Sequence, residues 1–485
     1  MPMGLSYVAG VLEHKGYEIQ LLDLLVSKYS KEKVRRKMSD FQPDVICITS
    51  VTMNYPVASE ILKYCRSLDQ NVVTVIGGPH VTFSAVDTLE NSPWIDIVVR
   101  GEGEETILDI VGGKSTENVD GIAYRVDGRV VLTRERALIE DLDALPLPAR
   151  HLFPLARYHS LDVHASLITG RGCPFNCIFC VGSKMGGRRA RYRNPELIVD
   201  EIEHALSYGF KEVNLEDDLV TLNHRHMYGI CDEITARGLK FNWSAFSRAD
   251  TVNPELLRRM KEAGCTWLLY GVESGNQGIL DTIKKKTTLE KIKQGVKMAK
   301  DAGIDIFASF VIGLPGETQD TLQESVKYAS ELGTFYGFHV LSPFPGTEIR
   351  EKAGEYGIEI LTDDWSKYDC NRPITRTEGA GPEELTAVLH EYYQALKLPI
   401  PERDTEKLNK AKMRSLLAGA LLKGDVIEGL GTIEASPDPV VTLAGKITDI
   451  LPYSLQQVTE ALGKWVGEGI LKFDRKGDRL VWMWS

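Results

Sequence analysis

The sequence lacks any long apolar run: none of its 485 residues lies in a stretch near the ~18 apolar residues that a membrane helix needs. Its start lacks the charged segment, apolar stretch and cleavage site of a secretion signal. Cysteine is scarce, and eight residues are too sparse for a disulfide framework. The formal net charge of -11 argues against a general nucleic-acid binder. We therefore expect a cytoplasmic protein with no membrane span and no general affinity for nucleic acid.

The composition is that of a globular protein with more than one core. Hydrophobic residues make up 43% and charged residues 26%, which leaves ample apolar surface to bury. The length exceeds what one core usually organises, so we expect two or three domains. Changes in pattern divide the chain into a first domain (1–135), a linker (136–160), a second domain (161–350), its extension (351–404) and a C-terminal domain (405–485).

The first domain alternates helical periodicity with short apolar runs, which is typical of βα units around a parallel sheet. The pattern predicts a hairpin at 121–132 that turns at Asp127-Gly128. We therefore expect a small Rossmann-like α/β domain. Its predicted strands are 18–22, 44–49, 72–76 and 95–99, and its predicted helices are 5–15, 31–41 and 57–68.

In the second domain, helices repeatedly end at a glycine that a strand follows within a few residues. Glycine accepts the left-handed conformation that closes a helix, and Asn194 and Asn253 stand where helices begin. Six such units predict a (β/α)6 partial TIM barrel with its functional groups at the carboxyl ends of the strands. The glycines are Gly209, Gly238, Gly264, Gly303 and Gly333, and the predicted strands are 165–169, 212–215, 240–246, 267–272, 305–312 and 337–341.

The barrel pattern lapses after about residue 347. Residues 383–396 predict a helix, and Pro399 and Pro401 begin another joint. The tail predicts a helix at 455–467 and a hairpin of 470–474 with 479–483, which suggests a small, mostly helical, winged-helix-like domain. Because no basic face accompanies it, a packing or substrate-capping role is favoured over DNA binding.

Three cysteines, Cys173, Cys177 and Cys180, follow the first barrel strand at close spacing. A structural zinc ion takes a fourth nearby ligand, yet the next cysteine is Cys231. A [4Fe-4S] cluster normally takes four cysteines, so three thiolates leave one iron open. The spacing therefore predicts a metal centre with a vacant position. A zinc knuckle and three coincidental core cysteines are the disfavoured alternatives.

This loop resembles that of the radical SAM superfamily, whose open iron binds S-adenosylmethionine (SAM) through its amino and carboxylate groups. The resemblance covers about residues 160–350 and continues in the phrases at 214–218, 247–248, 271–275, 312–317 and 343–347. It implies a SAM site that includes Phe179, Glu216, Asp217, Ser247, Arg248, Glu273, Ile312 and Gly313.

Some of these side chains also have a purely structural interpretation. Asp217 or Asp218 could cap a nearby helix. Glu273 is a stronger candidate, because the sequence shows no cation beside this strand-end carboxylate. A basic stretch follows the cysteines, and a solvated loop is favoured there over a site that steers an anionic substrate. That stretch contains Lys184, Arg188, Arg189, Arg191 and Arg193.

Residues 1–112 resemble the cobalamin-binding domain that precedes the barrel in one large subgroup of the superfamily. The likeness implies cobalamin contacts at Gly4, Leu5, Ser50, Val51, Thr52, Gly77, Gly78, His80, Gly101 and Glu102. The Asp-x-His-x-x-Gly motif that supplies a histidine to cobalt is absent, and His80 is the nearest substitute. The chain also begins where a first strand should already have ended, so we expect a truncated start or a sheet one strand short.

Together the resemblances imply a cobalamin-dependent radical SAM enzyme, interpreted as a methyltransferase. A reduced cluster would split SAM into methionine and a 5'-deoxyadenosyl radical, which takes hydrogen from an unactivated carbon, and methylcobalamin would supply the methyl group. The expected partners are a small-molecule or peptide substrate and a one-electron donor such as flavodoxin or ferredoxin.

Three alternatives remain at this stage. One is a cobalamin radical SAM enzyme that transfers no methyl group, such as an oxidative cyclase. Another is an RNA-modifying methylthiotransferase, which requires a second cysteine cluster that Cys47 and Cys65 do not supply. The third is a non-catalytic corrinoid carrier or sensor.

Overall fold

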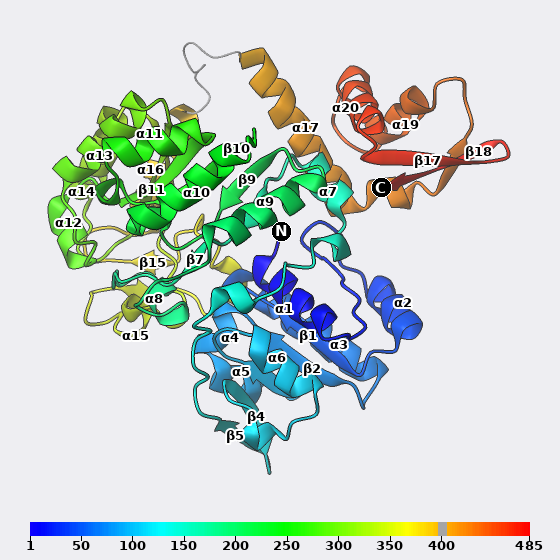
Figure 1. Cartoon of the computed structure of the whole chain (residues 1–485), viewed down its shortest axis with the longest axis horizontal. Coiled ribbons are helices and arrows are strands. Elements are labelled where there is room, and N and C mark those ends of the chain that lie inside the picture. Colours follow the sequence, from blue (N-terminus) through cyan, green and yellow to red (C-terminus); the bar gives the residue numbers. More distant parts are fainter. Residues whose placement is uncertain (396–404) are drawn as a thin grey trace.

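A computed structural model describes residues 1–395 and 405–485 of the chain. An α/β domain at the N-terminus, a larger α/β domain and a small C-terminal module are visible in Figure 1. Within the described residues, no helix combines the length and apolar character required to cross a membrane.

The N-terminal sheet has the strand order β1-β2-β3-β4-β5. The first three strands run parallel, and the last two form an antiparallel hairpin. Asp127 and Gly128 both have positive φ at its turn, as the Asp-Gly pair predicts. The elements are α1 (Met3–His14), α2 (Lys31–Phe41), β1 (Val45–Thr49), α3 (Tyr55–Leu68), β2 (Val73–Gly77), α4 (Pro79–Phe83), α5 (Ala85–Asn91), β3 (Ile97–Val99), α6 (Glu104–Val111), β4 (Ile122–Val126) and β5 (Arg129–Leu132).

The strand predicted at 18–22 is wrong, because this segment forms no strand and crosses between two cores instead. Leu21 packs against the barrel core, whereas Leu22 packs beside α2 and α3. Asp23, next along the chain, is buried and accepts a hydrogen bond of 2.5 Å from the Tyr158 hydroxyl. An apolar run alone does not reveal which core it serves.

The second domain is a six-stranded, all-parallel sheet in the order β13-β12-β11-β10-β9-β6, which confirms the partial barrel. Its strands are β6 (Ala165–Leu167), β9 (Glu212–Leu215), β10 (Asn242–Ser247), β11 (Cys265–Glu273), β12 (Asp305–Ile312) and β13 (Phe335–Val340). The helices around it are α9 (Pro195–Ser207), α10 (His224–Ala236), α11 (Pro254–Glu262), α12 (Gln277–Thr282), α13 (Leu289–Asp301) and α14 (Gln319–Glu331).

The local signals at the helix ends are confirmed. All five joint glycines have positive φ, between 58° and 95°. The side chains of Asn194 and Asn253 accept hydrogen bonds from the amides of Glu196 and Leu256, as N-caps do.

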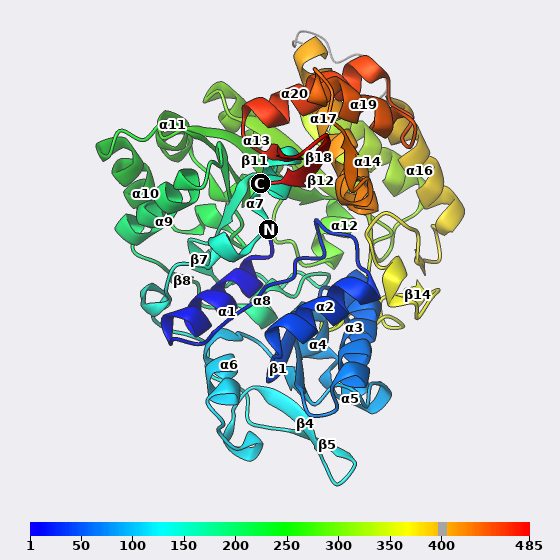
Figure 2. The ribbon, with the colours of Figure 1, turned by 90° about the vertical axis from the view of Figure 1, so that its right-hand side faces the viewer.

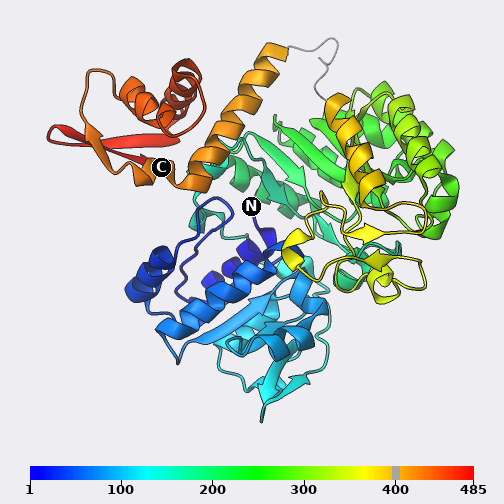
Figure 3. The ribbon, with the colours of Figure 1, turned by 180° about the vertical axis from the view of Figure 1, so that it is seen from behind.

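Short elements connect the two domains and extend the barrel. They include α7 (Leu155–Ser160), β7 (Gly170–Arg171), α8 (Gly182–Met185), β8 (Arg191–Tyr192), α15 (Glu348–Glu351), β14 (Glu359–Ile360), β15 (Thr375–Arg376) and α16 (Pro382–Ala395). Helix α1 lies where the N-terminal domain meets the barrel (Figure 2), and the extension lies beside both (Figure 3). The expected joint at Pro399 and Pro401 falls outside the described residues.

The C-terminal module packs helices on a three-stranded antiparallel sheet of order β16-β18-β17, which agrees with a winged-helix-like arrangement. The module has its own apolar core, which includes Leu462 and Trp465 of its last helix. Its elements are α17 (Thr405–Gly424), α18 (Val426–Gly429), β16 (Thr432–Glu434), α19 (Pro439–Thr448), α20 (Leu455–Gly467), β17 (Leu471–Lys476) and β18 (Arg479–Trp484).

We predict that Gly295→Ala destabilises the protein by roughly 1–3 kcal/mol, although alanine usually favours a helix. A Cβ at Gly295 in α13 would lie 2.0 Å from the carbonyl oxygen of Ala249, so the two segments must separate. Gly463→Ala in α20 is the matched control, because a Cβ there meets nothing within 4 Å. Thermal unfolding followed by circular dichroism should show a lower Tm only for the first variant, and equal Tm values would contradict the prediction.

Candidate functional site

The three clustered cysteines lie on a loop that backbone contacts hold in place. The Cys173 amide donates to the Gly187 carbonyl at 3.0 Å, and the Ile178 amide donates to the Ile283 carbonyl at 3.2 Å. Gly172 has a φ of 104°, and a Cβ there would lie 2.8 Å from the Gly186 carbonyl oxygen. The close approach of these backbones therefore requires glycine.

The donor set fits an iron–sulfur cluster. All three cysteines are free thiols, and the Gly182 amide donates to Cys180 Sγ at 3.3 Å, a contact that tunes a thiolate. Burial raises the pKa of the Cys177 thiol, while Lys285 and Arg248 act in the opposite direction. Among the described residues, no three Cys, His, Asp or Glu side chains converge on one ion. A cubane needs no such convergence, because each thiolate binds a different iron.

Three acidic residues at the end of β9 meet the start of this loop. Asp217 is buried and accepts hydrogen bonds of 2.6 Å from both the amide and the hydroxyl of Thr169. Burial raises its pKa to about 7. The Asp218 carboxylate accepts from the Gly172 amide at 3.2 Å. The helix-cap interpretation is therefore wrong for both, because each carboxylate bonds the segment that leads into Cys173.

Glu216 directly follows β9 and precedes Asp217. Its side chain is exposed at the carboxyl end of the barrel strands. Its carboxylate accepts from the Ser166 hydroxyl at 2.7 Å and from the Asn214 side-chain amide at 3.1 Å. Both hydrogen-bond partners are neutral, and the Met1 ammonium interacts electrostatically with this carboxylate. A carboxylate at this place suits a cationic ligand.

Arg248 and Ser247 stand at the end of β10. The guanidinium binds both Asp250 oxygens at 2.9 and 2.7 Å and lies 3.9 Å from the centre of the Phe175 ring. The Ser247 hydroxyl lies 2.6 Å from that of Thr221. Phe179 is partly buried against the barrel core.

Glu273 has a partner that the sequence interpretation missed. Lys285 Nζ lies 2.7 Å from Glu273 Oε1, and both side chains are less than a tenth exposed. The expectation of a carboxylate without a cation is therefore wrong. The pair lies twelve positions apart across α12, and only the Lys284-Lys285-Lys286 run hinted at it. Glu273 also adopts a φ of 70°, which is unusual for a residue other than glycine.

Gly313, after β12, is held by a buried carboxylate. Glu317 Oε2 accepts from the amides of Gly313 and Leu314, whereas Oε1 has no hydrogen-bond partner among the described residues. Burial raises the pKa of Glu317 to about 8.

The carboxyl edge of the N-terminal sheet has room for a flat ligand. A Cβ at Gly78 would lie 2.5 Å from the Ser50 carbonyl oxygen, so the loops after β1 and β2 touch. Val51 and Met53 are 47% and 41% exposed, and a Cβ at Gly101 meets nothing within 4 Å. This apolar edge fits a corrin ring, which would cover it.

His80 faces neighbouring aromatic rings. It is 1% exposed, stacks on Tyr55 at 4.3 Å between ring centres, and meets the edge of Trp365 at 4.9 Å. Burial lowers the pKa of His80 to about 4, so the imidazole is neutral. Neither ring nitrogen has a partner among the described residues.

The basic stretch is only partly the solvated loop that the sequence favoured. Arg191 and Arg193 are buried at the boundary with the N-terminal domain. Arg193 pairs with the fully buried Glu201, and Arg191 pairs with Glu102. Lys184, Arg188 and Arg189 fit the expectation, because all three are exposed. Arg189 pairs with the exposed Glu140, and Lys184 pairs with Glu351.

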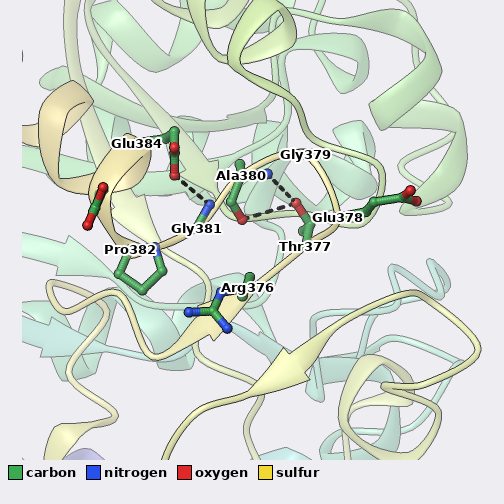
Figure 4. A pocket seen from close by; sticks show the side chains of 9 residues that line it. Arg376, Thr377, Glu378, Gly379, Ala380, Gly381, Pro382 and Glu384 are labelled. Atoms are coloured by element: carbon green, nitrogen blue, oxygen red, sulfur yellow. Dashed lines mark hydrogen bonds between the residues drawn. The ribbon is translucent and has the colours of Figure 1, made fainter.

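An open cavity of about 370 Å³ lies at the start of α16 and is lined by residues 376–384. Figure 4 shows that its polar groups bond one another. The Gly381 amide donates to Glu384 at 2.8 Å, and the Ala380 amide donates to Thr377 Oγ1 at 2.9 Å. These donors are already used, so the cavity has no free anion-binding group at these amides.

We predict that Cys177→Ala abolishes the EPR signal of a reduced cluster in anaerobically reconstituted protein, because one iron loses its thiolate. Cys231→Ala, which removes a buried thiol of α10, is the matched control and should keep the signal. An unchanged signal in Cys177→Ala would refute the assignment of this loop.

We predict that the stability of Glu317→Gln, measured as its free energy of unfolding, increases relative to that of the wild type as pH rises. The folded pKa of about 8 exceeds the usual 4.5, so the wild type loses stability across this window. The loss is about 1.4 kcal/mol per pH unit at most, and glutamine does not titrate. Urea unfolding from pH 4.5 to 8 tests this, with the half-exposed Glu331→Gln in α14 as control. A stability difference that stays constant with pH would contradict it.

Family models match two parts of the chain. The B12 binding domain matches residues 1–111, and the radical SAM superfamily matches residues 167–329. These matches coincide with the glycine-lined sheet edge and with the cysteine loop.

The chain is similar to several known proteins. An uncharacterised methyltransferase of Pyrococcus horikoshii is 33% identical over 399 residues, which span 81% of this chain and 86% of that protein. The anaerobic magnesium-protoporphyrin IX monomethyl ester cyclase of Cereibacter sphaeroides is 31% identical over 79% of this chain and 65% of that protein.

The fold is shared with the radical SAM methyltransferase TsrM of Kitasatospora setae, solved with cobalamin and a [4Fe-4S] cluster. The TM-score is 0.70 at 18% identity, over 87% of this chain and 94% of that one. The chain therefore belongs to the radical SAM superfamily, in the branch whose barrel follows a B12 binding domain.

Proposed function

We propose that this protein is a cobalamin-dependent radical SAM methyltransferase that acts on an unactivated carbon of a small molecule or peptide. The observation that carries the proposal is a loop of three free thiols on a barrel that directly follows a B12 binding domain. When bound, the cluster and SAM supply a 5'-deoxyadenosyl radical, and cobalamin supplies the methyl group.

Cys173, Cys177 and Cys180 would hold the cluster, and the strand ends would orient SAM. Glu216 is suited to the SAM ammonium, because its carboxylate is exposed and its hydrogen-bond partners Ser166 and Asn214 are neutral. The Glu273–Lys285 pair places one negative and one positive charge beside the cysteine loop. Both side chains interact electrostatically with the Cys177 thiol. Arg248 already binds Asp250 and would orient the loop through Phe175.

The cobalamin would lie on the loops after the strands of the N-terminal sheet. Gly101 leaves room there, Gly78 lets the loops after β1 and β2 touch, and the exposed side chains of Val51 and Met53 supply an apolar surface. His80 would support this surface from below, because its ring is enclosed by Tyr55 and Trp365. The cobalt would therefore have no histidine ligand from this residue.

The substrate would bind between the domains. The Phe83 ring of α4 packs against Gly346 in the loop after β13, where a Cβ would lie 2.3 Å from the ring. This contact brings the N-terminal domain to the carboxyl end of the barrel, where catalysis takes place in barrel enzymes. A cytoplasmic location suits the eight free thiols and an electron donor such as flavodoxin or ferredoxin.

An oxidative cyclase is the second candidate function, favoured by the 31% identity to the magnesium-protoporphyrin ester cyclase. Both reactions use the same cofactors, and they differ in the fate of the substrate radical. The choice between them therefore depends on the products formed.

We predict that the reduced, reconstituted protein consumes SAM to form both 5'-deoxyadenosine and S-adenosylhomocysteine in the presence of its substrate, because radical formation and methylation each use one SAM. Chromatography of both nucleosides after incubation with candidate substrates measures this. Cys177→Ala is the control and should form no 5'-deoxyadenosine. Turnover with 5'-deoxyadenosine alone would support the cyclase instead of the methyltransferase.

A further inference from the structure

Two carboxylates of the N-terminal domain bind two arginines beside the cysteine loop. Glu102 Oε1 lies 3.0 Å from Arg171 Nη1 and 2.9 Å from Arg191 Nη2, and Glu102 Oε2 lies 3.1 Å from Arg191 Nη1. Glu104 Oε1 lies 2.6 Å from Arg171 Nη2. We call these four residues the Glu–Arg bridge.

The Glu–Arg bridge contacts the chain on both sides of the cysteine loop. Arg171 lies two positions before Cys173, and β7 pairs Arg171 directly with Arg191 of β8. The Arg191 guanidinium also donates to the Gly186 carbonyl at 2.9 Å, and Gly186 follows the last cysteine by six positions. A movement of the two glutamates would therefore shift both ends of the loop together.

On the other side, the bridge begins at the expected cobalamin edge. Gly101, next to Glu102, follows β3 with a φ of 77° and has open space beside it. Glu104 is the first residue of α6, the helix that packs beside α1. The short loop between β3 and α6 therefore carries Gly101, an expected cobalamin contact. The same loop binds Arg171 and Arg191, which flank the cysteine loop.

The charges in the bridge are balanced and largely removed from water. The four side chains are between 4% and 14% exposed, and two carboxylates face two guanidiniums. Burial raises the pKa of Glu102, but the bonds from Arg191 and Arg171 outweigh it, so the net shift is downward and the carboxylate stays ionised. The planar guanidinium makes such pairs geometrically specific.

A separate contact also joins the N-terminal domain to the barrel, so the Glu–Arg bridge is not needed merely to hold the two domains together. The Tyr7 hydroxyl of α1 donates to Glu201 of α9 at 3.1 Å, and Glu201 also binds Arg150 at 2.6 Å. This contact holds α1 to the barrel helices, whereas the bridge meets the cysteine loop itself.

We propose that Glu102 and Glu104 are positioning residues that fix the cluster loop relative to the cobalamin edge, and thereby set the distance between cluster and cobalt. This inference rests on the proposed function, because it needs both cofactors. It also reassigns Glu102, which the sequence placed among the cobalamin contacts, to a role that acts through Arg171 and Arg191.

Pulsed dipolar EPR on protein loaded with hydroxocobalamin and a reconstituted cluster, then reduced to paramagnetic cluster and cob(II)alamin, measures the distance between the two centres. We expect one narrow distribution in the wild type and at least a twofold broader one in Glu102→Gln/Glu104→Gln. Glu105→Gln is the matched control, because Glu105 lies beside Glu104, is 56% exposed and faces Arg136 of its own domain. It should match the wild type.

The outcomes separate the two hypotheses. A double variant that carries both signals with the wild-type distribution overturns the bridge, whereas a wild type that lacks either signal overturns the proposed function. If the double variant fails to fold, Arg191→Lys keeps the charge and loses the bidentate fork. We expect a broader distribution there too, and an unchanged one overturns the bridge.

Discussion

The proposed function requires that three thiols bind three irons of one cluster and leave the fourth open, so the short loop that carries them has to keep one shape. Its sulfur atoms cannot enforce that shape before a cluster is present. Backbone contacts do so instead: glycine at 172 permits close approach to residues 186 and 187, and the Ile178 amide bonds the segment after α12. Asp217 and Asp218 add bonds from β9. The strand ends thus converge on the loop, and the SAM groups we propose lie around it.

The proposed function also requires that two cofactors on different domains face one substrate. A large apolar interface would hold the domains together but would permit sliding, because apolar contacts are not directional. Here the contacts at the boundary include buried ion pairs with fixed geometry, the Glu–Arg bridge and the Arg193–Glu201 pair. Burying these ion pairs removes four or more charges from water, which costs free energy. The pairs are therefore weak evidence for stability and better evidence for specific placement.

Much of the fold could be predicted because its signals are local. A glycine with positive φ or an Asn cap acts on its own helix end, and the predicted joints were confirmed at those residues. The strand prediction at 18–22 was wrong because the apolar pattern of this segment is compatible both with a strand and with a crossing between two cores. The partners of Glu273, Asp217 and Glu102 could not be predicted, because side chains far apart in sequence meet only in the folded chain. Arg191 and Glu102, for example, are 89 positions apart.

We propose that one chain holds an open-iron cluster and a cobalamin together. Anaerobic reconstitution with iron, sulfide and hydroxocobalamin, followed by metal analysis of the desalted protein, tests whether both are bound. We expect about four irons per chain together with cobalt in an amount equal to the protein. Iron without retained cobalt would argue against the cobalamin-dependent function, and protein without iron would overturn the assignment of the cysteine loop.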